Sequence, residues 1–248
     1  MKNEELFSIL KEKFREIAQE HQLFDKEITV RCRALSPEEA IGKTERKDFP
    51  ILTGKDIMIQ AEFDGGIGQA YTCAPTEFSG TLQEILEFDV LNNIHDRGIF
   101  IAALNAVTRR YGICDRSIHC KNDGPESCAE KAMEYLAETY GKDLNIAQVG
   151  YQPAMLEGLS RTFEHVRVLD LDPAHVGKTH FGICVLDGVK DYEETILDWA
   201  DLVLCTGSTL ANASIENFLD IGKDVLFYGT TGAGAAALMG WKRLCYAD

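Results

Sequence analysis

The sequence predicts an α/β protein whose first half is a mixed α+β domain and whose second half is built on a parallel sheet. In the first half, alternating strand patterns and the turn signal "FDGG" indicate antiparallel strands. From about residue 143, short apolar strands alternate with helices, which is typical of a parallel sheet covered on both faces. The region "ETYGKD", at Gly141, divides the chain into domains 1–141 and 142–248, and we expect a cleft between them.

The elements of the first half follow from local periodicity. Residues 3–20 have the spacing of an amphipathic helix, and residues 56–74 predict a hairpin. Residues 96–112 are apolar nearly all round, which predicts a buried helix whose central Asn105 needs partners for its amide. Bonds to neighbouring backbone would meet that need. Residues 27–35 alternate as a strand that presents one face through Ile28, Val30, Cys32 and Ala34.

The second half contains five runs with the character of buried strands, namely "LNIAQVGY", "HVRVLDLD", "DLVLCTGST", "DVLFYG" and "RLCYA". Between them, "PAMLEGLSRTF", "YEETILDWA", "NASIENFLDIG" and "AGAAALMGW" are expected to be helices. The stretch that contains "GICVLDG" is expected to be irregular. Neither an internal repeat nor a low-complexity linker interrupts this rhythm.

Composition argues against several classes of partner. The formal net charge of −15 argues against nucleic acid, whose binding needs clustered Lys and Arg. No apolar run approaches the roughly 20 residues that span a bilayer, and the N-terminal residues lack the features of a secretory signal, so we expect a cytoplasmic protein. Its eight cysteines are then thiols or ligands rather than a disulfide framework. Four of them are expected to be small buried side chains in apolar runs: Cys32, Cys184, Cys205 and Cys245.

Polar residues gather where four of the predicted strands end, in "GYQPA", "DLDPAHVG", "TGSTLANAS" and "YGTTGAGAA". Ligands of open α/β sheets bind beyond these carboxyl ends. Helix capping accounts for one polar residue in each loop but less well for the whole set. We therefore expect these four loops, called the rim below, to face a ligand. Asp170, twenty residues after Gly150, weakly matches the ribose-binding acid of dinucleotide folds. Asp170 and Asp172 are also compatible with metal ligands or with caps of a turn.

The stretch "CDRSIHCKNDGPESCAEK" (114–131) concentrates three cysteines and His119. Structural zinc sites use ligand pairs two to four residues apart, and the spacing of Cys114, Cys120 and Cys128 does not match. "SCAE" matches a capping box, and Pro125 is also compatible with a first turn. Either helix start predicts that Cys128 lies in the first turn, where the helix dipole lowers its thiol pKa. An inert, buried thiol is the alternative for Cys128. We expect the stretch to supply one or two metal ligands, with either His119 or Cys120 facing the crevice.

Several of these stretches resemble one known family. The motifs "GIFIAALNAVTRRYG", "HCKNDGPESCAE", "LVLCTGSTLANASIENFL" and "VLFYGTTGAGA", with "PEEAIG" and "GIGQAYT" earlier in the chain, are similar to the uncharacterised prokaryotic proteins described as "Putative heavy-metal chelation". The resemblance covers nearly the whole chain. It implies an N-terminal domain like the small N-terminal domain of enolases, a Rossmann-like C-terminal domain, a site in the crevice between them, and a role in binding heavy metals.

The candidate site combines this resemblance with the polar rim. The resemblance implies crevice roles for Asn105, Thr206, Gly207, Ser208, Thr209 and Asn212. The rim adds Gly150, Asp170, Gly229, Thr230 and Thr231. For a divalent or heavy metal ion, the candidate ligands are His119, Cys120, Cys128 and Asp172.

Three classes of function fit these residues. The first is metal chelation, and the second is an enzyme that acts on a small anionic or nucleotide-like ligand, such as one resembling S-adenosylmethionine or NAD, with His119 as acid or base. The third is a non-catalytic module that binds a metabolite or a metal chelate. The sequence contains no HExxH or GxSxG signature that would favour an enzyme. The expected partner is therefore a small molecule or a metal ion. Neither nucleic acid nor a membrane is expected as a partner, and a homodimer is compatible with the sequence.

Overall fold

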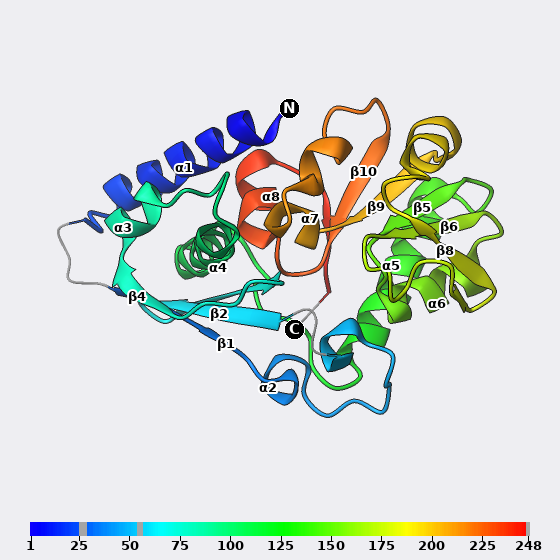
Figure 1. Ribbon diagram of the computed structural model, residues 1–248, viewed down its shortest axis with the longest axis horizontal. Helices are drawn as coiled ribbons and strands as arrows, with labels where there is room; N and C mark the ends of the chain where they lie inside the picture. The colour runs from blue at the N-terminus through cyan, green and yellow to red at the C-terminus, as the bar shows by residue number, and fades with distance from the viewer. Residues whose placement is uncertain (25–28, 54–56, 247–248) are drawn as a thin grey trace.

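The computed structural model describes residues 1–24, 29–53 and 57–246, and it confirms the α/β class (Figure 1). The predicted strand residue Ile28 lies outside the described residues. The α-helices are α1 (Asn3–Glu20), α2 (Pro37–Ile41), α3 (Leu82–Glu87), α4 (Ile94–Arg110), α5 (Gly124–Tyr140), α6 (Pro153–Thr162), α7 (Ser208–Ala211) and α8 (Ala233–Met239). Other helical segments are the 3₁₀ turns η1 (Pro50–Thr53) and η3 (Ser214–Phe218) and the π-helical η2 (Glu193–Trp199).

The strands form two sheets. A four-stranded antiparallel sheet has the order β3-β2-β1-β4 and contains β1 (Thr29–Ala34), β2 (Ile57–Phe63), β3 (Gly66–Thr72) and β4 (Phe78–Thr81). A seven-stranded sheet contains β5 (Ile146–Val149), β6 (Val166–Asp170), β7 (Thr179–His180), β8 (Ile183–Asp187), β9 (Leu202–Thr206), β10 (Asp224–Tyr228) and β11 (Arg243–Leu244). Both the hairpin and the alternating βα rhythm predicted from the sequence are confirmed.

The larger sheet has the strand order of a doubly wound fold. Its order is β11-β10-β9-β5-β6-β8-β7, and all neighbours are parallel except β7 and β8. When the six parallel strands are numbered along the chain and read from β8 to β11, their spatial order is 3-2-1-4-5-6, an arrangement that binds ligands where the order reverses. The reversal lies between β5 and β9. A ligand site is therefore expected beyond the carboxyl ends of these two strands.

The β2–β3 hairpin owes its tight turn to two residues with left-handed backbone. Asp64 has φ of 45° and Gly65 has φ of 81°. Positive φ at both central positions is typical of the type I′ turn, which matches the twist of the flanking strands and which Asp-Gly favours. The turn fixes the register, and this register places Tyr71 opposite Met58 near the far end of the hairpin.

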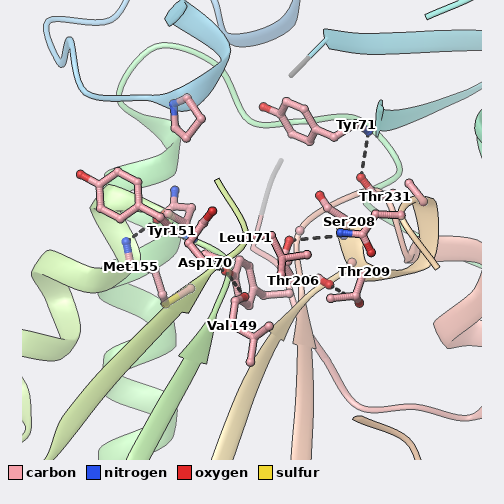
Figure 2. A pocket seen from close by; sticks show the side chains of 18 of the residues that line it. Tyr71, Val149, Tyr151, Met155, Asp170, Leu171, Thr206, Ser208, Thr209 and Thr231 are labelled. Atoms are coloured by element: carbon pink, nitrogen blue, oxygen red, sulfur yellow. Dashed lines mark hydrogen bonds between the residues drawn. The ribbon is translucent and has the colours of Figure 1, made fainter. Parts of the chain in front are cut away.

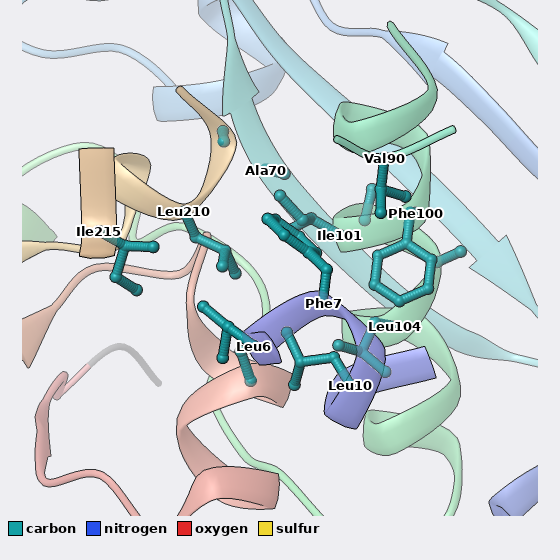
Figure 3. Packing of buried hydrophobic residues seen from close by; sticks show 14 of the residues in the cluster. Leu6, Phe7, Leu10, Ala70, Val90, Phe100, Ile101, Leu104, Leu210 and Ile215 are labelled. Atoms are coloured by element: carbon teal, nitrogen blue, oxygen red, sulfur yellow. The ribbon is translucent and has the colours of Figure 1, made fainter. Parts of the chain in front are cut away.

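Helix α4 is the structural centre of the molecule, and it lies between the smaller sheet and the helices α1 and α8 (Figure 1). Its residues Arg97–Thr108 are buried without a break, which confirms the helix predicted to be apolar all round. On the sheet side the backbones nearly touch, because a Cβ on Gly68 would lie 2.2 Å from the nitrogen of Ala106. Figure 3 shows the opposite side, where α1 and α4 pack together through Leu6, Phe7, Leu10, Phe100, Ile101 and Leu104.

The apolar core is continuous between the two sheets. The cluster around α4 extends to Val203 of β9 and Phe227 of β10, on one face of the parallel sheet. The other face is covered by α5 and α6, whose Leu136 and Leu159 pack on strand residues such as Leu204. Helix α5 thus packs on the parallel sheet although it precedes Gly141, and the division into domains 1–141 and 142–248 stays a prediction.

Three local predictions are wrong. The stretch with "GICVLDG" contains β8, which pairs in parallel with β6. The stretch "NASIENFLDIG" does not form one helix, because Ala213 adopts φ of 61° and separates α7 from η3. Cys184 is exposed rather than buried, because β8 pairs outwards only with the two-residue edge strand β7. Among the described residues, the helices lack the combination of length and apolar character that a bilayer span requires.

Candidate functional site

A cavity of about 670 Å³ lies beyond the carboxyl ends of β5, β6, β9 and β10, where the strand order reverses. Residues at the end of β3 and in the segment 49–51 form further walls. Figure 2 shows Tyr151 and Asp170 on one side of the cavity and Tyr71, Ser208 and Thr231 on the other. Residues that neighbour both sheets therefore enclose a single space of a size typical of small-molecule sites.

The structure brings together all of the predicted site residues except Asn105. From the predicted rim, the cavity is lined by Gly150, Asp170, Thr206, Gly207, Ser208, Thr209, Asn212, Gly229, Thr230 and Thr231. The predicted metal ligands His119, Cys120, Cys128 and Asp172 line it as well, so His119 and Cys120 both face the cavity, where the sequence predicted only one of them. Cys73, Tyr151, His175 and Cys245 also line it. Tyr151 and His175 lie in the predicted rim stretches "GYQPA" and "DLDPAHVG" but were not among the predicted site residues, and neither were Cys73 and Cys245.

The floor of the cavity is a set of closely packed strand ends. Gly150 has φ of 86°, and a Cβ there would lie 2.6 Å from Cγ2 of Thr206. A Cβ on Gly207 would lie 2.5 Å from the nitrogen of Gly232, so the loops after β9 and β10 need glycine at their contact. The Tyr228 hydroxyl reaches the carbonyl oxygens of Val149 and Gly150 at 2.9 and 2.8 Å. Burial raises the pKa of Tyr228, so this hydroxyl stays a hydrogen-bond donor.

Several rim side chains are engaged in hydrogen bonds within the protein. The Thr209 hydroxyl donates to the carbonyl of Thr206 at 2.7 Å, and the Asn212 amide oxygen accepts from the backbone nitrogen of Ser214 at 2.9 Å. The Thr231 hydroxyl accepts from the backbone nitrogen of Tyr71 at 3.0 Å and so links the loop to β3 (Figure 2). Capping and bridging therefore account for these three side chains.

Thr230 differs from its neighbours on the rim. It is only 2% exposed, it lines the cavity, and its hydroxyl has no hydrogen-bond partner among the described residues. A buried hydroxyl without a partner costs free energy, roughly 1–3 kcal/mol in mutational studies. A polar group of a bound molecule would remove that cost, so Thr230 is the rim residue that most directly favours a ligand.

Asn105 lies outside the cavity wall and supports it from behind. Its side-chain nitrogen lies 2.9, 3.2 and 3.0 Å from the carbonyl oxygens of Gln69, Thr230 and Thr231. Its side-chain oxygen accepts from the backbone nitrogen of Gly234 at 2.7 Å. Hydrogen bonds to neighbouring backbone were one way, expected from the sequence, to satisfy the Asn105 amide, and these contacts support that alternative. Asn105 positions the loop after β10 instead of facing the cavity.

Asp170 also organises backbone at the end of its strand. Its carboxylate accepts from the backbone nitrogens of Tyr151 at 2.5 Å and Asp172 at 2.6 Å. One carboxylate oxygen lies 3.8 Å from Nδ1 of His175, whose ring packs on the Tyr151 ring at 4.7 Å between centroids. The Tyr151 hydroxyl lies 3.2 Å from Nδ1 of His180, and burial raises the pKa of Tyr151 to about 12. Of this aromatic and imidazole cluster, Tyr151, Asp170 and His175 line the cavity.

His119 is held against the edge of β3. Its backbone nitrogen donates to the side-chain oxygen of Gln69 at 2.7 Å, and its ring meets Tyr71 edge-on with centroids 5.7 Å apart. Nδ1 lies 2.7 Å from the carbonyl oxygen of Cys120. Enclosure by the surrounding protein lowers the pKa of His119, which favours the neutral imidazole. Because that contact suits a protonated Nδ1, Nε2 is the nitrogen left to act as an acceptor.

The prediction of an acidified thiol at Cys128 is wrong. Helix α5 begins at Gly124 after Asp123, so Cys128 lies beyond the first turn, and Ser127 is not its cap. The pKa of Cys128 is raised, chiefly by its contact with the Cys120 thiol. The backbone nitrogen of Tyr246 donates to the Cys128 sulfur at 3.3 Å. The thiol is therefore a neutral, hydrogen-bonded group of the cavity wall at neutral pH.

Arg46 ties the segment before η1 to helices α5 and α6. The guanidinium donates to Glu126 of α5 at 3.1 Å and pairs with Glu157 of α6. It also lies over the rings of Phe49 and Phe181, 5.9 and 5.7 Å from their centroids. Through these contacts the segment presents residues 49–51 to the cavity.

The cavity wall does not contain a complete metal cage. Among the described residues, no three or more His, Cys, Asp and Glu side chains are grouped so that they could hold an ion. The predicted ligands share a cavity without converging on one point. Within the described part of the wall, the charged side chains are Asp170 and Asp172, and neither Lys nor Arg is present. The site thus offers thiols, imidazoles, hydroxyls and carboxylates, but no fixed positive charge for an anion.

The fold and this cavity define an α/β protein with a ligand-sized site at the switch point of its parallel sheet. A family model, DUF364, described as "Putative heavy-metal chelation", matches residues 132–235, and the resemblance seen in the sequence is confirmed. A protein of unknown function from this family in Pyrococcus horikoshii has a crystal structure 18% identical to the chain, with a TM-score of 0.53 over 92% of this chain and 80% of that one. A second, from Desulfitobacterium hafniense, is 17% identical, with a TM-score of 0.48 over 74% and 72%. The first likeness shows a shared fold, and no curated protein matches the chain.

Proposed function

We propose that the cavity binds a heavy-metal ion carried in a complex with a small organic chelator. The observation that carries this proposal is the composition of the wall. Four of the eight cysteines, Cys73, Cys120, Cys128 and Cys245, line one mostly apolar cavity together with His119 and His175. Thiolate and imidazole are the ligands that soft and borderline metals prefer. The description of the matching family supports the same class of cargo.

The size of the cavity favours a metal complex over a bare ion. A bare ion needs only a few ligand atoms within a radius of about 2.5 Å. The cavity of about 670 Å³ is instead typical of sites for organic molecules. The wall also lacks a complete set of ligands among the described residues. A chelator would fill the apolar volume and complete the coordination that the protein leaves open.

The charges of the wall favour a neutral or cationic ligand. Asp170 and Asp172 carry negative charge, and the described wall contains neither Lys nor Arg. An enzyme that acts on an anionic or nucleotide-like substrate would have to neutralise the negative charge of that substrate with backbone N–H groups and hydroxyls alone. A cationic metal complex meets no such cost, and a polar edge of its chelator could satisfy the hydroxyl of Thr230.

Thermal unfolding of the reduced protein tests the proposal. We expect Cd²⁺ with one equivalent of bipyridine to raise Tm more than Cd²⁺ or bipyridine alone, because binding to the native state stabilises it by about 2.7 kcal/mol at a ligand concentration 100 times Kd. Ser208→Trp should remove this response, because Ser208 lines the cavity and its bulky replacement fills it. Ser8→Trp, on the exposed face of α1, is the matched control. An equal response to the bare ion, or an undiminished response of Ser208→Trp, would refute the proposal.

A further inference from the structure

Three cysteines from three separate parts of the chain meet in one wall of the cavity. Cys120 precedes α5, Cys128 lies on α5, and Cys245 follows β11 near the end of the chain. The Cys128 thiol is within hydrogen-bonding reach of both the Cys120 thiol and the Cys245 thiol. Cys128 is therefore common to two thiol pairs. The sequence suggested Cys120 and Cys128 as ligands, but it indicated only a buried apolar role for Cys245.

The surrounding contacts hold the three segments together. A Cβ on Gly124 would lie 2.8 Å from the Cys120 Cβ, so glycine at the start of α5 permits the close approach of Cys120. The C-terminal segment is tied to the same region by Arg243, which donates to the carbonyl of Asp115 at 2.8 Å. The Tyr246 nitrogen donates to the Cys128 sulfur at 3.3 Å, and such a donor also stabilises a thiolate. The cluster is thus part of the fold rather than a chance contact of mobile side chains.

This arrangement distinguishes among metals. Zn²⁺ in a protein site takes four ligands in a tetrahedron, and the described residues offer no group of even three. Cu⁺, Ag⁺ and Hg²⁺ are softer, and each binds two thiolates strongly while it can also accept donor atoms of a chelator. Either pair that contains Cys128 supplies two sulfurs, and each pair faces the cavity.

We infer that Cys128 is the shared protein ligand of a soft ion held by two thiolates, with Cys120 as the second thiolate in one arrangement and Cys245 in the other, while the chelator supplies the remaining ligands. The inference rests on the proposed function and narrows its cargo to ions that accept two thiolates. On binding, each of the two thiols gives its proton to solvent, and two metal–sulfur bonds form without any change of oxidation state. The third thiol stays protonated beside the site, where it can replace one ligand.

Competition for Cu⁺ against its bicinchoninate complex tests this shared role under reducing conditions. Cys128→Ser removes both pairs and should weaken Cu⁺ binding by about 100-fold or more. Cys120→Ser and Cys245→Ser each keep one pair, so each should weaken binding by about twofold to tenfold. The double variant Cys120→Ser with Cys245→Ser should match Cys128→Ser. Cys184→Ser, an exposed cysteine away from the cavity, should bind as the native protein does.

Either of two results would overturn the inference that Cys128 is the shared ligand. Equal losses in the three single variants would indicate a three-thiol site, and an unchanged Cys128→Ser would exclude the cluster altogether. Cys128→Ala, with circular dichroism and Tm measured for every variant, separates loss of a ligand from loss of folding. If Cys128→Ser still binds the cadmium–bipyridine complex while Ser208→Trp does not, only the shared-ligand inference fails and the proposed function stands.

Discussion

The side-chain oxygen of Asn105 accepts a hydrogen bond from the backbone nitrogen of Gly234 at 2.7 Å. The two residues are far apart in the sequence, and the bond joins the middle of α4 to the first turn of α8. The nitrogen of the same amide reaches the carbonyl oxygens of Thr230 and Thr231, so one buried side chain holds the loop after β10. Because that loop forms part of the cavity wall, the core helix and the candidate site are mechanically connected.

Replacement of Asn105 by Ala should destabilise the protein strongly. The change leaves one backbone N–H and several carbonyl oxygens buried without their partner, at a cost of about 1–3 kcal/mol for each unpaired group. We expect a loss of at least about 3 kcal/mol in the free energy of unfolding, measured in urea. Asn92→Ala, on the exposed surface, should change it by less than about 0.5 kcal/mol. A loss below 1 kcal/mol for Asn105→Ala would show that water or relaxation replaces the amide.

Asn105 also shows how much of the structure can be predicted from the sequence. The apolar pattern around it predicts a buried helix, and burial of an amide requires partners, so the need for hydrogen bonds is visible in the sequence. The partners are not visible, because Gly234 becomes a neighbour only after the parallel sheet has formed. The family resemblance placed Asn105 in the crevice, whereas its amide is occupied one layer behind the wall.

The missed and mistaken residues have a common physical cause. The ends of the central strands of the parallel sheet, such as β5 and β9, are well predicted because runs of apolar residues mark these strands. His175 lies in the turn after β6 and Cys245 follows β11, and the direction of such connecting residues depends on tertiary packing. Cys184 lies in an apolar run, yet its exposure depends on the position of β8 near a sheet edge. Local patterns carry no information about position in the sheet.

Gly68→Ala should separate β3 from α4. A Cβ at this position would lie 2.2 Å from the nitrogen of Ala106 and 2.3 Å from the carbonyl oxygen of Ala102, and helix backbone cannot yield as a side chain can. We expect a loss of about 3 kcal/mol or more in the free energy of unfolding, because the overlap must move the helix. Guanidinium unfolding followed by circular dichroism measures this loss.

Gly98→Ala, on α4 itself, is the control for Gly68→Ala on β3. Its added Cβ would have Oγ1 of Thr72 as its nearest neighbour, at 3.4 Å, which is an ordinary van der Waals contact. Alanine is favoured over glycine inside a helix by about 1 kcal/mol. We therefore expect Gly98→Ala to be neutral or stabilising. Similar losses for both variants would contradict the assignment of the β3–α4 contact to Gly68.

Alkaline pH should destabilise the protein partly through Cys205. Burial raises the pKa of this thiol to about 12 from a usual value near 9. Between these values the unfolded chain loses the proton while the native state keeps it, so stability falls as pH rises from about 9 towards 12. The contribution is about 1.4 kcal/mol at pH 10 for one such thiol.

Urea unfolding at pH 8 and pH 10 measures this contribution. Cys205→Ala should lower stability at both pH values, because it leaves a cavity, yet it should lose less between them than the native protein does. Cys184→Ala removes an exposed thiol and should leave the pH dependence unchanged. An identical pH dependence for Cys205→Ala and the native protein would show that Cys205 does not resist ionisation in the folded state.

Two adjacent threonines in the cavity wall should respond in opposite directions to the same substitution. Thr230 and Thr231 are each 2% exposed, but the Thr231 hydroxyl accepts from the Tyr71 nitrogen while the Thr230 hydroxyl has no partner among the described residues. Thr230→Val removes an unsatisfied polar group at nearly constant volume and should stabilise the free protein by about 1 kcal/mol. Thr231→Val leaves a buried N–H unpaired and should destabilise it by about 1–3 kcal/mol.

The same pair tests whether the unsatisfied hydroxyl belongs to the ligand site. If Thr230 contributes a hydrogen bond to the bound complex, Thr230→Val should raise Tm without ligand and reduce the additional rise caused by cadmium–bipyridine. Stability and binding would then change in opposite senses in one variant. A Thr230→Val protein that is less stable than the native one would mean that an internal partner, such as an ordered water, already satisfies this hydroxyl. An undiminished response to the complex would place the polar contact of the ligand elsewhere on the rim.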